Sequence, residues 1–268
     1  MKKILLLIAV TLTFLAGCAN NDTSTNPTTN TNLDGKSNLK VYLVDSPASL
    51  DSVIILVNRV EVHKADSDST GGWYVINDSL RAFDLLQLRN GASSVLGDSI
   101  LEPGMYTQIR LILAEGSYVI EDGIKHNLTV PSGLQTGIKL NHEFTLEPDN
   151  IYELVLDFNV DKSIHITGNK KYMMNPVIRV MPVIISGSIS GQVLPTDALA
   201  TVFTTVDGDT VSTYPDSLGY FKLMVLPEGI YDVEITPENA AYKDTVLTGV
   251  NVFANQNNDV GTVELQNN

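Results

Sequence analysis

Cysteine is nearly absent from this chain: Cys18 is the one cysteine in 268 residues. The chain therefore cannot form an internal disulfide, and after Cys18 no thiol is present to act as a nucleophile. Basic residues are also scarce, with 17 Lys and Arg against 31 Asp and Glu and a formal net charge of -14. Such an excess of negative charge disfavours nucleic acid and anionic lipid as partners.

Long hydrophobic runs are missing as well, apart from one near the N-terminus. Residues 4–15 are mostly apolar and follow Met-Lys-Lys at positions 1–3. The run is too short to span a bilayer, which takes about 20 residues, but it suits the core of a signal peptide. It ends in Leu-Ala-Gly-Cys at positions 15–18, which resembles the lipobox of bacterial lipoproteins. The resemblance implies that residues 1–17 are a signal peptide and that Cys18 is lipidated.

The segment behind Cys18 fits an anchored protein. Cleavage removes Lys2 and Lys3, which takes the net charge from -14 to -16, so attachment must come from the acyl chains. Ala19 stands where an Asp would favour retention in the inner membrane, which implies the outer membrane, on its periplasmic or cell-surface face. Residues 18–38 offer almost nothing to bury, and we expect a disordered tether there.

From residue 39 onward, short runs of β-branched and aromatic residues end in turn residues, which predicts strands. Asp122 and Gly123 predict a tight hairpin, because this pair accepts the positive φ of a type I′ turn. Residues 83–88 predict a short helical turn. No longer stretch has a helical period, so we expect an all-β fold with two β-sandwich domains, residues 39–185 and 186–268. The main runs that predict strands are 39–44, 53–62, 73–76, 108–113, 118–120, 124–130 and 151–160.

A turn containing Pro and then Gly or Asn precedes a tyrosine three times, at Tyr106, Tyr152 and Tyr231. This pattern predicts tyrosine corners, in which the ring enters the core and the hydroxyl bonds to backbone a few residues upstream. The copy at Tyr152 is looser, because Asp149 and Asn150 stand in place of the glycine.

Two motifs lie close together near the C-terminus. Residues 215–221 read Pro-Asp-Ser-Leu-Gly-Tyr-Phe, and residues 226–233 read Leu-Pro-Glu-Gly-Ile-Tyr-Asp-Val. Together they resemble the carboxypeptidase regulatory-like domain, a small transthyretin-like β-sandwich grouped with carbohydrate-binding-like folds. The resemblance covers residues 186–265 and implies a mostly structural role. Tyr214 and Pro215 depart from it, since an Ala or Val usually precedes the Asp.

Six segments carry a second resemblance: residues 43–47 (Leu-Val-Asp-Ser-Pro), 103–111, 130–133, 136–140, 155–158 (Val-Leu-Asp-Phe) and 176–179 (Pro-Val-Ile-Arg). Through them, residues 39–185 resemble a bacterial lipoprotein domain family of unknown function. The resemblance implies a β-domain at the cell surface or in the periplasm and supplies no established active site.

One loop has the composition of a metal site. Asp66, Asp68 and Thr70, followed by Gly71, match the first half of a calcium-binding loop. The bidentate Glu expected at the twelfth position is replaced by Asn77, and the flanks predict strands rather than helices. A solvated hairpin loop has the same composition. Calcium is the one cofactor that the sequence suggests, and we expect no other.

Other polar residues favour structural roles. Glu61 and His63 share one face of a strand, a possible zinc pair, but no third ligand is identifiable and polar surface positions are favoured. Six charges lie in or beside apolar strands, where inward ion pairs are favoured over a cleft: Arg110, Lys139, Asp157, Asp161, Lys162 and Arg179.

The composition and motifs therefore predict a non-enzymatic, lipid-anchored protein of the cell envelope. We expect adhesion or the binding of an extracellular polymer such as a glycan. An alternative is an assembly component that pairs with a protein partner through its sheet edges. A hydrolase stays open as a third possibility, although no motif for a serine nucleophile or a phosphate loop is present.

Overall fold

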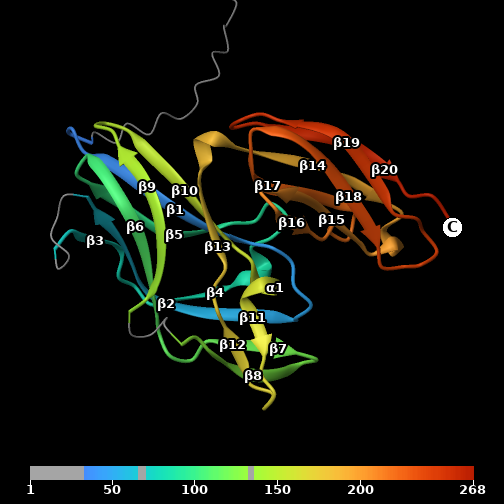
Figure 1. The fold of residues 1–268 in the computed structure, drawn as a ribbon, viewed down its shortest axis with the longest axis horizontal. Coiled ribbons are helices and arrows are strands. Elements are labelled where there is room, and N and C mark those ends of the chain that lie inside the picture. Colours follow the sequence, from blue (N-terminus) through green and yellow to red (C-terminus); the bar gives the residue numbers. More distant parts are fainter. Residues whose placement is uncertain (1–32, 66–70, 132–135) are drawn as a thin grey trace, which may run out of the picture. The chain divides into compact units, whose positions relative to one another are not determined.

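The computed structural model describes residues 33–65, 71–131 and 136–268, and strands dominate this part of the chain (Figure 1). The predicted all-β fold is confirmed. The helical pieces are short, and none of those described is long and apolar enough to cross a membrane. They are α1 (Val160–Ser163) and the 3-10 turns η1 (Leu85–Gln87), η2 (Val183–Ile185) and η3 (Thr196–Ala198).

The strands up to β13 form two sheets. One sheet has the order β13-β10-β1-β5, in which β1 and β10 run parallel. Its strands are β1 (Ser37–Asp45), β5 (Ser94–Leu101), β10 (Ile151–Phe158) and β13 (Ile178–Pro182). The other sheet has the order β11-β12-β8-β7-β2-β6-β9, and β3 and β4 also pair with its long strand β2. Its strands are β2 (Ser52–Lys64), β3 (Trp73–Asn77), β4 (Arg81–Asp84), β6 (Gly104–Leu113), β7 (Tyr118–Glu121), β8 (Ile124–Thr129), β9 (Ile138–Leu146), β11 (Ile164–Ile166) and β12 (Tyr172–Met174).

The remaining seven strands form a second pair of sheets, ordered β17-β14-β20 and β16-β15-β18-β19. They are β14 (Ser186–Leu194), β15 (Ala200–Val206), β16 (Asp209–Thr213), β17 (Tyr220–Pro227), β18 (Gly229–Pro237), β19 (Thr245–Val252) and β20 (Asn257–Glu264). η2 separates the two groups at the predicted boundary between residues 185 and 186. Residues 33–268 are nevertheless one compact unit, so the division into two domains stays a prediction.

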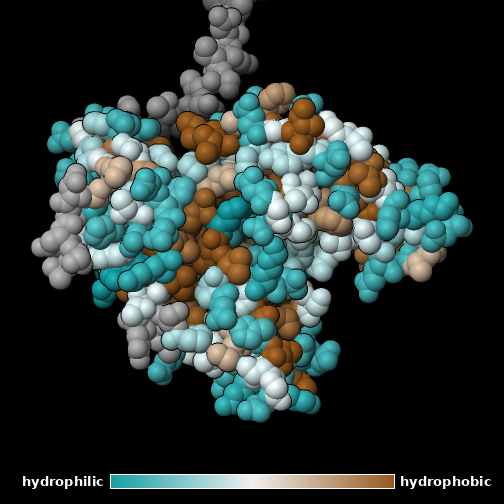
Figure 2. All heavy atoms as spheres, in the orientation of Figure 1, coloured by the Kyte–Doolittle hydropathy of each residue, from teal (hydrophilic) through white to brown (hydrophobic). Residues whose placement is uncertain are grey.

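Each pair of sheets encloses a core of its own. In β1, Leu39, Val41 and Leu43 are fully buried at every second position, the period of a strand with one face inward. The first core extends to Met174 and the second begins at Ile189. Outside them, hydrophobic side chains gather over β10 and β13 on the face shown in Figure 2.

The fold begins earlier than the sequence predicts. Residues 33–38 were expected within a tether that ends at Asn38, but Leu33 is buried and β1 starts at Ser37. The Ser37 hydroxyl donates to the carbonyl of Glu147, and Asp149 accepts a bond from the Gly35 N–H at 2.9 Å. The segment is ordered by the buried Leu33 and by its bonds to Glu147 and Asp149, which lie more than a hundred residues further along the chain. Its polar composition alone predicts disorder. The earlier part of the predicted tether lies outside the described residues.

Local signals predict several details correctly. Asp122 and Gly123, both with positive φ, join β7 to β8 as the predicted hairpin. The expected helical turn is present as η1, although it is shorter than residues 83–88. Two tyrosine corners are confirmed, with hydroxyl bonds of 2.9 Å from Tyr106 to the Glu102 carbonyl and from Tyr231 to the Pro227 carbonyl.

Candidate functional site

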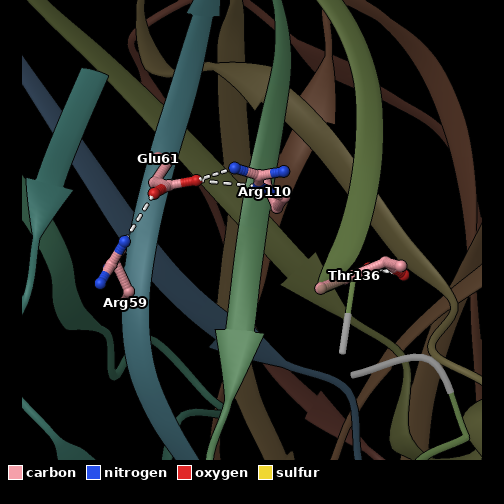
Figure 3. A network of polar contacts seen from close by, with 5 residues as sticks. Arg59, Glu61, Arg110 and Thr136 are labelled. Carbon is pink, nitrogen blue, oxygen red and sulfur yellow. Dashed lines mark hydrogen bonds and ion pairs between the residues drawn. The ribbon is translucent and has the colours of Figure 1, made fainter. Parts of the chain in front are cut away.

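The carboxylate of Glu61 is buried on β2 and held by two arginines (Figure 3). Val60 and Val62 point into the core, so the alternation of the strand turns Glu61 to the other face. Arg110 of β6 lies directly opposite in the ladder, and its Nε and Nη2 donate to Glu61 Oε2, Nε at 2.8 Å. Arg59 Nη1 donates to Oε1 at 3.2 Å. Both oxygens of the carboxylate therefore face a charged donor.

Trp73 of β3 covers this network. The guanidinium carbon of Arg110 lies 3.9 Å from the centre of the indole, a cation–π contact. The His63 ring meets the same indole edge-on at 5.0 Å, and its Nδ1 lies 3.3 Å from Thr107 Oγ1. Glu61 and His63 are thus each engaged by protein partners. Among the described residues, no three His, Cys, Asp or Glu side chains converge as a metal site.

A second ion pair between neighbouring strands confirms the predicted pairing, although, like the Glu61 pair, it lies on the face away from the first core. Asp157 of β10 lies opposite Arg179 of β13, whose Nη2 donates to Asp157 Oδ2 at 2.7 Å. Lys162 pairs at 2.6 Å with the exposed Asp209. The other two charges that were predicted to pair are exposed: Lys139 and Asp161.

Asp45, at the end of β1, is a buried acid that the sequence analysis did not single out. Its Oδ1 accepts a bond from the Val160 N–H at 3.2 Å, while Oδ2 has no partner among the described residues. Burial, together with the charge of Asp157, raises the pKa of Asp45 to about 9. Burial also raises the pKa of Asp157, against the opposing effect of the Arg179 guanidinium.

An open groove of about 600 Å³ lies on the second pair of sheets. Tyr214 supplies its aromatic surface, and Asp216 and Glu238 supply two carboxylates. Leu199 contributes an apolar side chain that is 64% exposed, on a backbone held in the left-handed region with φ 49°. The remaining lining residues are small, hydroxylated or proline: Ser49, Val193, Pro195, Thr196, Ala200, Thr201, Pro215, Ser217, Gly219, Thr236 and Pro237.

Four residues that the sequence analysis proposed as sites lie outside the described residues. They are Cys18, the predicted lipidation site, and Asp66, Asp68 and Thr70, the predicted calcium ligands. Both predictions stand as expectations from the sequence.

Comparison with known proteins identifies the family of the first part of the chain. Residues 36–176, more than half of the chain, match the family described as "Domain of unknown function (DUF4382)". The chain belongs to the DUF4382 family. No curated protein matches the chain.

Solved structures resemble the DUF4382 protein only weakly. The cohesin–X-dockerin complex from Acetivibrio cellulolyticus is 26% identical over 30% of this chain and 58% of that chain, with a TM-score of 0.25. The shaft pilin SpaA from Lactobacillus rhamnosus GG is 8% identical over 87% and 98% of the two chains, with a TM-score of 0.26. The minor pilin of Streptococcus agalactiae is 11% identical over 85% and 96%, with a TM-score of 0.22. At these TM-scores the likenesses carry no conclusion for this chain.

The DUF4382 segment contains the Glu61 network, Asp45 and Asp157, whereas the groove is lined, except for Ser49, by residues that follow it. Three of the motifs that carry the resemblance to a lipoprotein domain family converge in the fold. Residues 43–47 supply Asp45, residues 155–158 supply Asp157, and residues 176–179 supply Arg179. The sequence shows the three motifs, but only the pairing of β1, β10 and β13 brings their charges together.

Proposed function

We propose that this DUF4382 protein is a lipid-anchored, non-enzymatic protein of the outer membrane that binds an extracellular polymer, with a neutral glycan as the ligand class. The lipobox at residues 15–18 supports the anchor. The groove between η3, β15 and the 214–219 loop carries the proposal of binding, because it is open and its volume of about 600 Å³ suits a small part of a polymer.

The lining of the groove suits an uncharged sugar chain. Sugars present hydroxyls along their edges and C–H groups on their faces, which match hydroxyl and carboxylate groups beside an aromatic ring. Thr196, Thr201 and Ser217 supply hydroxyls, and Tyr214 supplies the ring, with the Arg89 guanidinium carbon 5.4 Å from its centre. The lining contains Asp216 and Glu238 but no Lys, Arg or His. Anionic polymers would therefore meet repulsion, and neutral ones would not.

We propose further that the second pair of sheets is a carboxypeptidase regulatory-like domain. The predicted turn motif supports this assignment. Asp216 Oδ1 accepts bonds from the N–H groups of Leu218 and Tyr220, both at 2.9 Å, and Gly219 has a φ of 87°. Asp and Gly are thus the residues that this turn requires, as in the motif.

The binding experiment uses the chain from residue 19, which omits only the predicted signal peptide and Cys18. We expect retention on neutral polysaccharides and none on anionic ones. Tyr214→Ala should weaken binding at least tenfold, about 1.4 kcal/mol. Phe253→Ala is the matched control, because Phe253 is an exposed aromatic outside the groove, and it should bind normally.

Three outcomes would contradict the proposal. Equal loss in both variants would show that the groove is not the site. Failure on every glycan, with a defined protein co-purifying, would favour assembly through sheet edges. Release of reducing ends from a retained glycan would identify a hydrolase.

A further inference from the structure

We propose that the DUF4382 protein rests on a neutral lipid surface through four exposed isoleucines at one end of the sheet that contains β1. We call them the isoleucine patch, and they are Ile100, Ile151, Ile184 and Ile185. This inference rests on the proposed lipid anchor, which would hold the fold close to a membrane. The patch shares no residue with the groove that is proposed to bind a polymer.

The strand pairing brings the four side chains to the same end of the sheet. Asn38 of β1 pairs with Ile100 of β5 on one side and with Ile151 of β10 on the other. β13 runs antiparallel to β10 and ends at Pro182, opposite Leu154. η2 follows directly and packs against β10, so it lies level with the first residues of that strand (Figure 1). Figure 2 shows hydrophobic side chains exposed over η2.

The patch contributes little to the folded core. The exposed fractions are 51% for Ile100, 40% for Ile151, 69% for Ile184 and 55% for Ile185. η2 contains no buried residue, and neither of its isoleucines belongs to either core. Single exposed hydrophobic residues are ordinary on a protein surface, whereas a group of them marks a surface that another apolar phase covers.

The path of the chain favours a membrane as that apolar phase. The fold begins at the same end of the sheet, because the Gly35 N–H donates to Asp149, two residues before Ile151. Cys18 stands 15 positions before Leu33, and even a fully extended chain of that length spans only about 50 Å. A lipidated Cys18 would therefore hold this end of the fold within reach of its own membrane.

The charges beside the patch select the lipid headgroup. Lys36 is paired with Glu102 at 2.9 Å. Three exposed acids at this end form no ion pair among the described residues: Asp34, Glu147 and Asp149. These carboxylates would repel anionic headgroups, whereas a zwitterionic headgroup presents an ammonium that they attract. The occupant is therefore a zwitterionic lipid surface.

The position of the groove agrees with this arrangement. η2 leads directly into β14, and the groove lies at the other end of that strand, where Val193 and Pro195 line it. The nine residues of β14 extend about 30 Å. A fold that rests on lipid through η2 would thus keep the groove about 30 Å from the patch, free to bind a polymer.

The test uses the chain from residue 19 with an N-terminal histidine tag, bound to phosphatidylcholine vesicles that contain a nickel-chelating lipid. No cysteine follows Cys18, so a single introduced cysteine can carry an environment-sensitive dye. In Ile184→Cys we expect the dye emission to shift to the blue on these vesicles. Leu218→Cys is the matched control, because Leu218 is similarly exposed but lies at the groove end of β14, and its dye should not shift.

A second substitution tests the patch as a unit. Adding Ile151→Ser to the labelled Ile184→Cys chain should reduce the blue shift by at least half. Equal shifts at residues 184 and 218, or none at either, would overturn the proposal. A shift at residue 184 that appears without vesicles as the protein concentration rises would identify a second copy as the occupant and would also overturn it.

The anchor is tested separately, because the histidine tag replaces it in the vesicle experiment. Mass spectrometry of the mature protein should find Cys18 acylated. An unmodified Cys18 would overturn the proposed anchor, and with it docking in the cell, whichever way the dye responds. An acylated Cys18 with no dye shift would overturn the docking alone.

Discussion

The guanidinium of Arg110 lies against the carboxylate of Glu61 from the directly opposite position on the neighbouring strand, with Trp73 stacked over it. A shift of one residue between β2 and β6 would turn Glu61 into the core and leave it there without its partner. Val60 and Val62 would at the same time leave the core. The pair therefore specifies the register of the central strands of the nine-stranded sheet.

Replacing Arg110 should strongly destabilise the folded protein. Arg110→Ala leaves a buried carboxylate with one half-exposed partner, and we expect a loss of about 3–5 kcal/mol in the free energy of unfolding. Arg59→Ala removes an arginine that is 46% exposed and should cost under about 1 kcal/mol. Urea denaturation of both variants measures the contrast. Similar losses in the two would show that Arg110 does not dominate the network.

The tyrosine corners allow a comparison among three similar sequences. Tyr106→Phe and Tyr231→Phe each remove a hydroxyl bond of 2.9 Å and should each cost about 1 kcal/mol. Tyr152 stacks on Phe144 at 5.5 Å, and its hydroxyl makes no corresponding bond among the described residues. Tyr152→Phe should therefore be neutral in thermal unfolding. A loss at Tyr152 equal to the other two would refute this distinction.

Stability should depend on pH through Asp45. Its pKa in the folded chain is about 9, above the ordinary 3.8, so between these values the folded chain binds a proton that the unfolded chain has released. The stability that goes with this proton is complete below pH 3.8 and is lost as pH rises toward 9.

Asp45→Asn cannot ionise, so its Tm should exceed that of the unmodified chain at pH 8, by about 5 °C or more, and by less at pH 5. Thermal scans at the two pH values check this. A constant difference would mean that Asp45 does not titrate across this window.

Leu199 offers a test in which stability and binding move in opposite directions. A left-handed leucine is strained by about 1–2 kcal/mol, and asparagine tolerates this conformation. Leu199→Asn should therefore leave Tm unchanged or raise it, while weakening polysaccharide binding several-fold, because the exposed leucine lines the groove.

Leu218→Asn is the matched control, since Leu218 is 63% exposed and lies outside the lining of the groove. It should change neither quantity. If Leu199→Asn binds as well as the unmodified chain, its side chain takes no part in the groove.

Local patterns predict the strands and turns, because each depends on neighbouring residues. The boundary of a strand is predicted less well. The run at residues 151–160 predicts a strand, but β10 stops at Phe158, because Asn159 Oδ1 caps α1 by accepting the Lys162 N–H at 2.9 Å. Asp45 reads as a turn residue beside Ser46 and Pro47, and only the strand pairing and α1 bury it. The groove could not be predicted from the sequence either, because its lining comes from segments that are separate in the chain.

The parallel strand pairs also determine when this protein can fold. Leu39 in β1 pairs with Tyr152, and Ile189 in β14 pairs with Asn258. Neither opening strand can form its parallel pair until these later residues have been made. Pairings so distant in the chain make folding slow. During synthesis, the sheet that contains β1 stays incomplete until β13 is made up to Pro182, and the sheet that contains β14 stays incomplete until β20 is made up to Glu264. Until β10 and β20 are made, the opening strands β1 and β14 each lack a neighbour, and a chain in that state can pass end-first through a narrow channel.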